Sequence, residues 1–163
     1  MPLEDLRLVT LSHRGMDGVD HTGEIVVHRD AAAGVVQVFS ALFDARFPIR
    51  RMELIDVYGG DDDLSTLANN TSGFNCRETT GGSGWSQHSY GTAIDINPVQ
   101  NPYVSHGSVL DPSATRYLDR SLDEPGMIHD GDAVVQAFSA IGWDWGGHWS
   151  EPLDYQHFSR SGG

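Results

Sequence analysis

Apolar residues recur with changing periods along the chain, and each change marks a predicted element. Two short apolar-rich segments, Leu6–Leu11 and Glu24–His28, predict strands. The segment Ala31–Phe47 has apolar side chains at helical spacing and predicts an amphipathic helix that Asp30 caps and Pro48 ends. The apolar face of this predicted helix consists of Val35, Val38, Phe39, Leu42 and Phe43.

The remaining elements are predicted to be shorter. They are a strand at Met52–Tyr58, a helical turn capped by Asp61–Asp63 and running to Ala68, a flexible segment at Thr79–Gly84, a strand at Thr92–Asn97, a small helix at Ala114–Arg120, and a helix at Ala133–Ile141 that Asp130 or Asp132 starts and Gly142 stops. Because strands and helices do not alternate strictly, we expect an α+β fold with a small, mostly antiparallel sheet flanked by helices. A length of 163 residues fits one domain over residues 1–163. Residues 30–163 are its predicted core, and residues 1–29 are a less certain N-terminal extension.

Charge and cysteine content exclude several classes of protein. The formal charge is −13 with only 10 Lys and Arg residues, and these are scattered, so we expect no nucleic-acid partner. No apolar run is long enough to predict a membrane span. The single Cys76 excludes an intrachain disulfide and a thiolate-rich zinc site, and we expect it to be a buried, inert thiol.

The strongest local pattern is SQHSYGTAID at residues 86–95. In an extended Thr92–Asn97 the side chains alternate, so Ile94 faces the core while Asp95 faces the other side. Gly91 allows a sharp turn that folds the His88 imidazole back toward Asp95. An imidazole and a carboxylate held together suit a zinc ion. A lone His–Asp pair is more often an ordinary hydrogen bond, so this pattern alone leaves both interpretations open.

A catalytic zinc needs a third protein ligand and an open fourth position for water. The candidate ligand is His157 in the segment DYQHF. Asp154 lies three residues earlier, so the two side chains do not share one face of a regular strand. If the segment bends there, Asp154 can act as the general base on the zinc-activated water.

The two motifs, SxHxxGxAxD and DxxHF after the Trp-rich turn GWDWGGHW, resemble those of the D-alanyl-D-alanine carboxypeptidase-like metallopeptidases. That superfamily includes the vancomycin-resistance carboxypeptidases and the L-alanyl-D-glutamate endolysins. The likeness extends through FPIRRMELIDVYGGDD, NNTSGFNCR and AIDINPVQNPY, so it covers most of the chain from about Phe47. It implies the hedgehog/DD-peptidase-like fold and a zinc-dependent peptidase that acts on D-amino-acid-containing stem peptides of peptidoglycan. A D,D-carboxypeptidase is slightly favoured over an L-alanyl-D-glutamate endopeptidase.

The resemblance also implies roles for individual residues. One zinc ion would be held by His88, Asp95 and His157, with Asp154 as the catalytic base. Arg77 would lie over the metal, where a guanidinium can pair with a substrate carboxylate or stabilise an oxyanion.

Two further residues have alternative roles. We expect Ser86 to hydrogen-bond the substrate or a ligand, although a loop serine can equally bond its own backbone. His148 stands in the Trp-rich turn, where the relatives are expected to have an acidic residue, and is a second candidate for contact with metal or substrate. Trp143, Trp145 and Trp149 are expected to form core and cleft wall.

A different class of function stays open. Hedgehog-type signalling domains are similar in fold and metal ligands but are binding proteins, so the alternative is a non-catalytic zinc-containing domain that binds cell wall or protein. The presence of both Asp154 and Arg77 favours the enzyme. We expect a monomer whose partners are stem peptides, with the long segment Val99–Met127 selecting the bond that is cut. The first residues lack a secretory signal, so an extracellular or wall-associated location requires an export signal outside this sequence, and a cytoplasmic location stays open.

Overall fold

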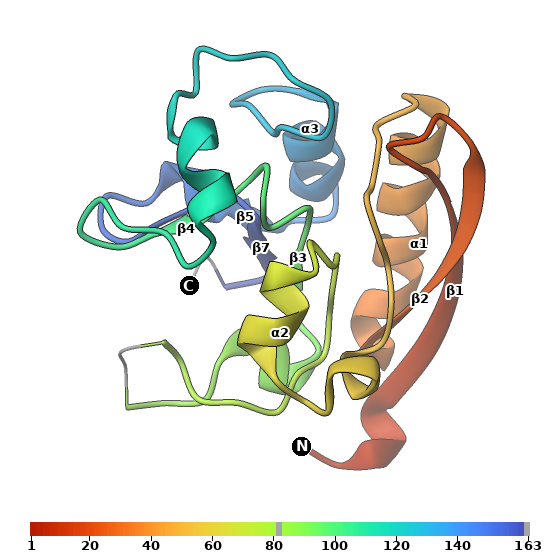
Figure 1. Cartoon of the computed structure of the whole chain (residues 1–163). Helices are drawn as coiled ribbons and strands as arrows, with labels where there is room; N and C mark the ends of the chain where they lie inside the picture. The colour runs from red at the N-terminus through yellow and green to blue at the C-terminus, as the bar shows by residue number, and fades with distance from the viewer. Residues whose placement is uncertain (81–82, 162–163) are drawn as a thin grey trace.

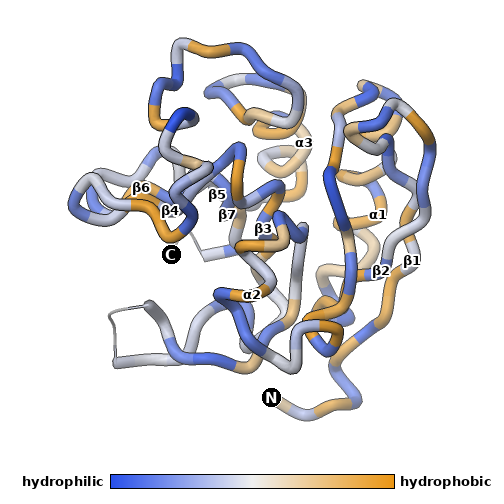
Figure 2. The backbone as a smooth tube through the Cα atoms, viewed as in Figure 1, coloured by the Kyte–Doolittle hydropathy of each residue, from blue (hydrophilic) through white to orange (hydrophobic). Residues whose placement is uncertain are grey.

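A long hairpin opens the fold in the computed structural model, which describes residues 1–80 and 83–161. Strands β1 (Leu6–Arg14) and β2 (Asp20–His28) pair antiparallel from Leu6↔His28 to Arg14↔Asp20. Both strands are longer than predicted. Figure 2 shows hydrophilic and hydrophobic positions mixed along the hairpin, and full backbone pairing between the strands lets the polar segments Ser12–Arg14 and Asp20–Thr22 remain extended.

Helix α1 (Arg29–Asp44) packs against the hairpin in Figure 1. Four of its five predicted apolar positions are buried, namely Val35, Val38, Phe39 and Leu42. The prediction that Asp30 caps this helix was wrong by two residues. The N-cap is His28, whose ring accepts a hydrogen bond from the Asp30 backbone N–H at 3.1 Å. The helix also ends at Asp44, before Pro48 can interrupt it.

The strand predicted at Met52–Tyr58 is wrong, because Met52–Leu54 has no regular secondary structure and Ile55–Tyr58 is a 3₁₀ helix. The apolar residues there suggested a strand, but the Tyr58 hydroxyl donates to the Glu53 carboxylate at 2.6 Å and closes the chain into a turn. Burial and the Glu53 carboxylate raise the pKa of Tyr58 to about 12. The next helix, α2 (Asp62–Leu67), begins as predicted, with Asp61 accepting from the Leu64 backbone N–H.

All the remaining strands are short and antiparallel. β3 (Ala93–Asp95), β7 (His157–Ser159) and β5 (Asp144–Trp145) form a sheet in the order β3-β7-β5. β4 (Tyr103–Val104) pairs separately with β6 (Leu153–Asp154). The strand predicted at Thr92–Asn97 is therefore shorter than expected, because Asn97 adopts a left-handed conformation with φ of 46°. Further 3₁₀ helices are Leu3–Asp5, Gln87–Tyr90, Pro112–Leu118 and Gly146–His148.

One core joins these parts. Helix α3 (Ala133–Ala140), capped by Asp132 as predicted, packs against α1, and its Phe138 stacks on Phe158 of β7 with ring centroids 4.0 Å apart. Hairpin residues Ile25 and Val27 are buried in the same cluster. The fold is thus α+β in a single domain, as predicted, but its strands form three small sheets in place of one.

Buried asparagines attach the irregular segment after β3 to this core. The Asn97 side chain accepts from the Arg50 N–H and donates to the carbonyls of Pro48 and Gly126. Asn101 donates to the Gly126 carbonyl and accepts from the Ile128 N–H at 2.8 Å. Backbone groups that no sheet satisfies are thereby hydrogen-bonded.

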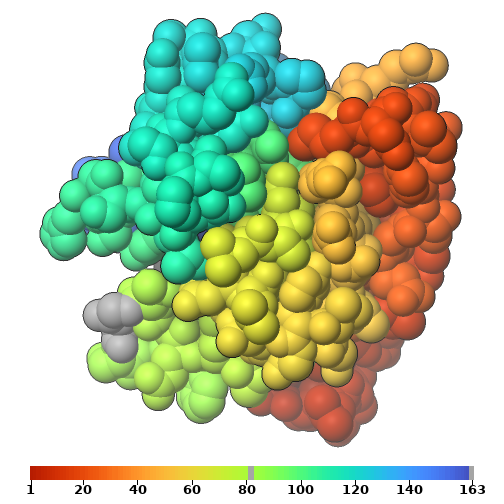
Figure 3. Space-filling model, in the orientation of Figure 1, coloured from red at the N-terminus to blue at the C-terminus, as the bar shows by residue number. Residues whose placement is uncertain are grey.

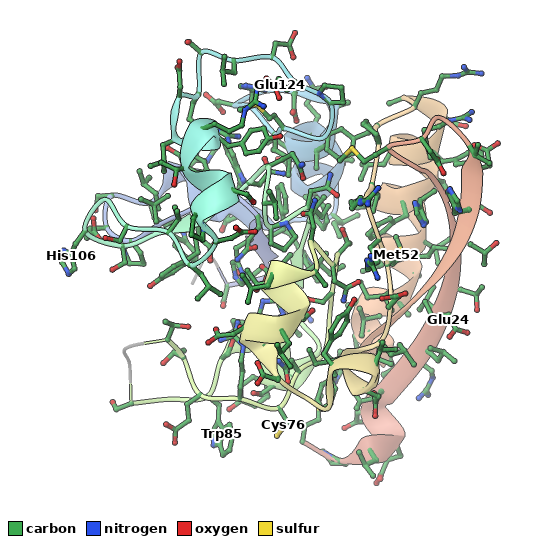
Figure 4. The ribbon with its side chains drawn as sticks, in the orientation of Figure 1. Glu24, Met52, Cys76, Trp85, His106 and Glu124 are labelled. Atoms are coloured by element: carbon green, nitrogen blue, oxygen red, sulfur yellow. The ribbon has the colours of Figure 1, made fainter. Side chains whose placement is uncertain are left out.

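Three other sequence-based expectations concern single features. Cys76 is exposed and not buried, and Figure 4 places it at the lower edge of the molecule. The segment expected to be flexible, Thr79–Gly84, includes residues 81–82, which lie outside the described residues. Among the residues that are described, no helix has the length and apolar character needed to cross a membrane.

Gly91 offers a test of how the turn before β3 is built. Its φ is +64°, and a Cβ there would lie 2.5 Å from the His28 backbone nitrogen. Gly59 has φ of +66° with nothing within 4 Å of the added carbon. We expect Gly59→Ala to cost about 1–3 kcal/mol from backbone strain alone, and Gly91→Ala to cost clearly more because of the added contact. Urea unfolding of both variants measures the difference, and equal losses would contradict this packing.

Candidate metal centre and cleft

Strand pairing brings two of the candidate ligands together. In the β3–β7 pair, Asp95 lies directly opposite His157. Their side chains meet with His157 Nδ1 3.0 Å from Asp95 Oδ1. The Asp95 backbone is also fixed from its other side, because it exchanges two hydrogen bonds of 3.0 Å with Ser72. The carboxylate is therefore held in place by neighbours on both edges of β3.

The third candidate, His88, reaches the same point from a 3₁₀ helix, Gln87–Tyr90. Ser86 caps this helix, since its Oγ accepts from the His88 N–H at 3.3 Å, and Gly91 ends it in a left-handed conformation. His88 Nε2 lies 3.1 Å from Asp95 Oδ2 and 3.3 Å from His157 Nδ1. The sharp turn predicted at Gly91 is therefore present and orients the imidazole toward the carboxylate.

These donors suit a divalent metal ion. A tetrahedral zinc with bonds of about 2.0–2.1 Å needs ligand atoms about 3.3 Å apart, close to the separations found here. The Nδ1–H of His88 donates to the Gly73 carbonyl at 2.7 Å, which leaves the lone pair of Nε2 directed at the cluster. Within the described residues, His88, Asp95 and His157 are the group of metal-binding side chains whose ligand atoms all lie within 4.8 Å of one another.

Burial makes the charges of the cluster interdependent. Burial alone would raise the pKa of Asp95, but the charge and hydrogen bonds of His88 and His157 lower it below its ordinary value. Burial conversely disfavours a charged His88, yet Asp95 outweighs this and raises the pKa of the imidazole. The cluster therefore keeps an anionic carboxylate between two rings, an arrangement that favours a cation placed there.

Asp154 lies beside this cluster without belonging to it. It ends β6, opposite Tyr103, and a turn at residues 155–156 separates it from His157. This turn is the bend that the three-residue spacing requires. Gly146 packs against the bend so tightly that a Cβ there would lie 2.6 Å from the Asp154 carbonyl oxygen and 3.3 Å from the His157 Cβ.

The Asp154 carboxylate has properties that suit proton transfer. It is 7% exposed, and its Oδ1 has no hydrogen-bond partner in the described part of the chain. Burial and the nearby charge of Asp95 raise the pKa of Asp154 to about 7. A carboxyl group with such a pKa can accept and release a proton near neutrality.

Arg77 lines the same cleft as His88 and His157. Its Nε lies 2.9 Å from Asp62 Oδ1, and that oxygen also accepts from the Asn75 side-chain amide at 3.0 Å. Asp62 and Asn75 therefore orient the guanidinium, a function that the sequence pattern did not assign to them. Asp62 lies on α2, well before Asn75 and Arg77 in the sequence, so no spacing indicated that it meets them.

Two remaining candidates have other contacts. The Ser86 hydroxyl caps the helix that carries His88, which is the local backbone role that the sequence left open, and the residue also lines the cleft. His148 is exposed and pairs with Asp130 at 2.8 Å, so it lies outside the ligand cluster. Trp143 and Trp145 are buried in the core, while Trp149 forms part of the cleft wall.

The cleft itself has a volume of about 450 Å³. Figure 3 shows the surface hollowed between the segment that follows α2 and the segment that contains β4. Figure 4 places Trp85 on the lower of these segments and His106 at the tip of the upper one. The lining includes the charged residues Asp62, Asp63 and Arg77 and the apolar residues Val109, Leu110, Trp149 and Pro152. The cleft thus combines charged groups, apolar groups and two of the candidate ligands, His88 and His157.

Comparison with known families agrees with this geometry. Residues 80–160 match the sequence model of a family described as D-alanyl-D-alanine carboxypeptidase. The matched region includes the ligand cluster, Asp154 and the apolar residues that line the cleft. No curated protein and no solved structure matches the chain significantly. On this match, the chain belongs to the D-alanyl-D-alanine carboxypeptidase-like metallopeptidase family.

Removal of one imidazole tests the cluster. We expect His88→Ala to lose most of the zinc that the intact chain retains after loading and dialysis, because two side-chain ligands hold the ion far more weakly than three. His148→Ala removes an imidazole that is paired with Asp130 outside the cluster and should retain the metal. Elemental analysis of both variants gives the zinc content per chain. Full retention in His88→Ala would exclude His88 from the ligand set.

Proposed function

We propose that this chain is a zinc-dependent peptidase that hydrolyses D-amino-acid-containing stem peptides of peptidoglycan. The observation that carries the proposal is the cluster of His88, Asp95 and His157 beside a buried carboxylate, Asp154, with an unpaired oxygen. The family match supports the peptidase class and the peptidoglycan substrate. Removal of a C-terminal D-alanine is slightly favoured over cleavage of an L-alanyl-D-glutamate bond.

In the proposed reaction, His88, Asp95 and His157 hold one zinc ion. A zinc ion in such a site polarises a carbonyl group and makes an ionised water available near neutral pH. Asp154 takes a proton from the attacking water and returns it to the leaving amine as the peptide C–N bond breaks. Burial and the unpaired Oδ1 leave this carboxylate available to accept that proton.

Arg77 supplies positive charge to the cleft wall. The guanidinium is always charged and can pair with the terminal carboxylate of a peptide or with the oxyanion that forms during attack. Asp62 neutralises part of this charge while it orients the Arg77 side chain. The Asp62 side chain itself is about one-third exposed. The net charge of −13 does not oppose an anionic substrate at this point, because salt screens charges that lie more than about 10 Å away.

The alternative function is a zinc-containing domain of the same fold that binds cell wall or protein without catalysis. Such a domain needs the zinc ligands but has no use for a buried carboxylate with an unpaired oxygen. Asp154 therefore favours the enzyme. We further propose that the protein acts as a monomer at the cell wall, where its substrate is found.

Turnover of a defined peptide tests the proposed reaction. We expect the zinc-loaded chain to release D-alanine from L-alanyl-γ-D-glutamyl-L-lysyl-D-alanyl-D-alanine, and chelation of zinc to abolish the release. Mass spectrometry distinguishes this product from a peptide split after L-alanine, which would identify the endopeptidase. No product from this peptide or from a mixture of muropeptides, with zinc bound, would contradict the peptidase and support the binding domain.

Substitution of the proposed base separates catalysis from metal binding. We expect Asp154→Asn to retain zinc and to lower kcat by about 10²–10⁴, the usual contribution of a general base. Asp130→Asn removes an exposed carboxylate that pairs with His148 and should leave kcat unchanged. Steady-state kinetics and elemental analysis measure the two effects. Loss of zinc from Asp154→Asn would show that Asp154 is a ligand and not the base.

A further inference from the structure

Gln156 occupies an unusual position in the cleft. It lies between the candidate base Asp154 and the candidate ligand His157, and it lines the cleft together with both. Its backbone is fixed, because the Gln156 carbonyl accepts from the Ile96 N–H at 3.0 Å. The residue is only 6% exposed. Because the backbone is fixed and the side chain is buried, the carboxamide has few alternative conformations.

The Gln156 carboxamide differs from the other buried amides of this chain. Asn70, Asn97 and Asn101 each use both ends of the side chain to hold backbone groups of neighbouring segments. Gln156 Oε1 is buried and has no partner among the described residues. Buried polar groups are nearly always hydrogen-bonded, and an unpaired one lowers stability. Gln156 therefore has no structural role of the kind that the asparagines have.

The chemistry of the cleft indicates what this carboxamide binds. Asp154 Oδ1 is a second buried oxygen without a partner, so this part of the cleft offers acceptors that need a donor. A carboxamide oxygen accepts a hydrogen bond from a peptide N–H, and the carboxamide NH₂ donates to a peptide C=O, so Gln156 can bond the backbone of a bound peptide through either group. A terminal carboxylate would be served better by Arg77.

We propose that Gln156 is a substrate-binding residue whose carboxamide hydrogen-bonds a backbone peptide group of the bound stem peptide, next to the bond that is cut. The inference rests on the proposed function, since it assumes that a peptide occupies the cleft. Gln156 lines the same cleft as Asp154 and His157, so this contact would help to hold the peptide backbone in place there. The sequence pattern gave no signal for it, because a glutamine between two functional residues has no characteristic spacing.

The variant Gln156→Met tests this assignment, because methionine has a similar length and shape but no hydrogen-bonding amide. We expect KM for the pentapeptide to rise at least about tenfold, with zinc content unchanged. The melting temperature should stay the same or rise, since an unpaired buried group has been removed. Gln37→Met on the exposed face of α1 is the matched control and should change neither KM nor zinc content. An unchanged KM in Gln156→Met would overturn the inference and assign the carboxamide to an ordered water or to folding.

A binding measurement separates failure of this inference from failure of the proposed function. Calorimetry with zinc-loaded Asp154→Asn and the pentapeptide gives Kd without turnover, and adding Gln156→Met should raise that Kd by a similar factor. If the peptide binds but the intact chain does not cleave it, the proposed peptidase activity is wrong. The ratio of the Kd values with and without Gln156→Met then still decides whether Gln156 binds the peptide. If the peptide neither binds nor is cleaved, both proposals are wrong. A lower melting temperature with unchanged Kd would show that Gln156 is structural.

Discussion

The antiparallel register of β3 on β7 is the constraint on which the site depends. It sets Asp95 opposite His157, and a shift of one residue would turn one of the two side chains to the other face of the sheet. Both strands are only three residues long, so their own hydrogen bonds do not fix this register. The next pair along, Ile94 and Phe158, is fully buried, and Phe158 stacks on Phe138 of α3. Packing of the core therefore positions the candidate metal ligands.

The chain treats its buried polar groups in two ways. Asparagines in the irregular segments are paired with backbone groups, and they hold long loops against a small sheet. Asp154 and Gln156, which line the cleft, have buried oxygens without a partner. Groups of the first kind stabilise the fold, while groups of the second kind destabilise it unless a ligand satisfies them. Arg51 Nε and Ser159 Oγ are also buried without a partner in the described part of the chain but do not line the cleft, so the contrast marks Asp154 and Gln156 only together with their position in the cleft.

Much of the site could be predicted from the sequence, since its residues lie in two short motifs with characteristic spacing. The strand position of Asp95, the turn at Gly91 and the bend before His157 follow from local geometry, and the structure has all three. Contacts between distant segments could not be predicted in this way. Asp62 meets Arg77 only because α2 packs beside the cleft, and no periodicity indicates that pairing.

For the fold too, local features were predicted and contacts between distant segments were not. The face of α1 and the starts of α2 and α3 follow from apolar spacing and capping residues. The strand expected at Met52–Tyr58 failed because a side-chain bond from Tyr58 to Glu53 closes a turn that its composition does not reveal. The exposed Cys76 shows the same limit, because burial depends on which segments cover a residue and not on its type alone.

The central claim is that three side chains from two distant motifs hold one ion. Crystals of the zinc-loaded chain, with diffraction recorded on both sides of the zinc absorption edge, test it most directly. We predict one anomalous peak within about 2.0–2.2 Å of His88 Nε2, His157 Nδ1 and a carboxylate oxygen of Asp95. A peak at another cluster, or none at this site when zinc is bound to the protein, would contradict the account.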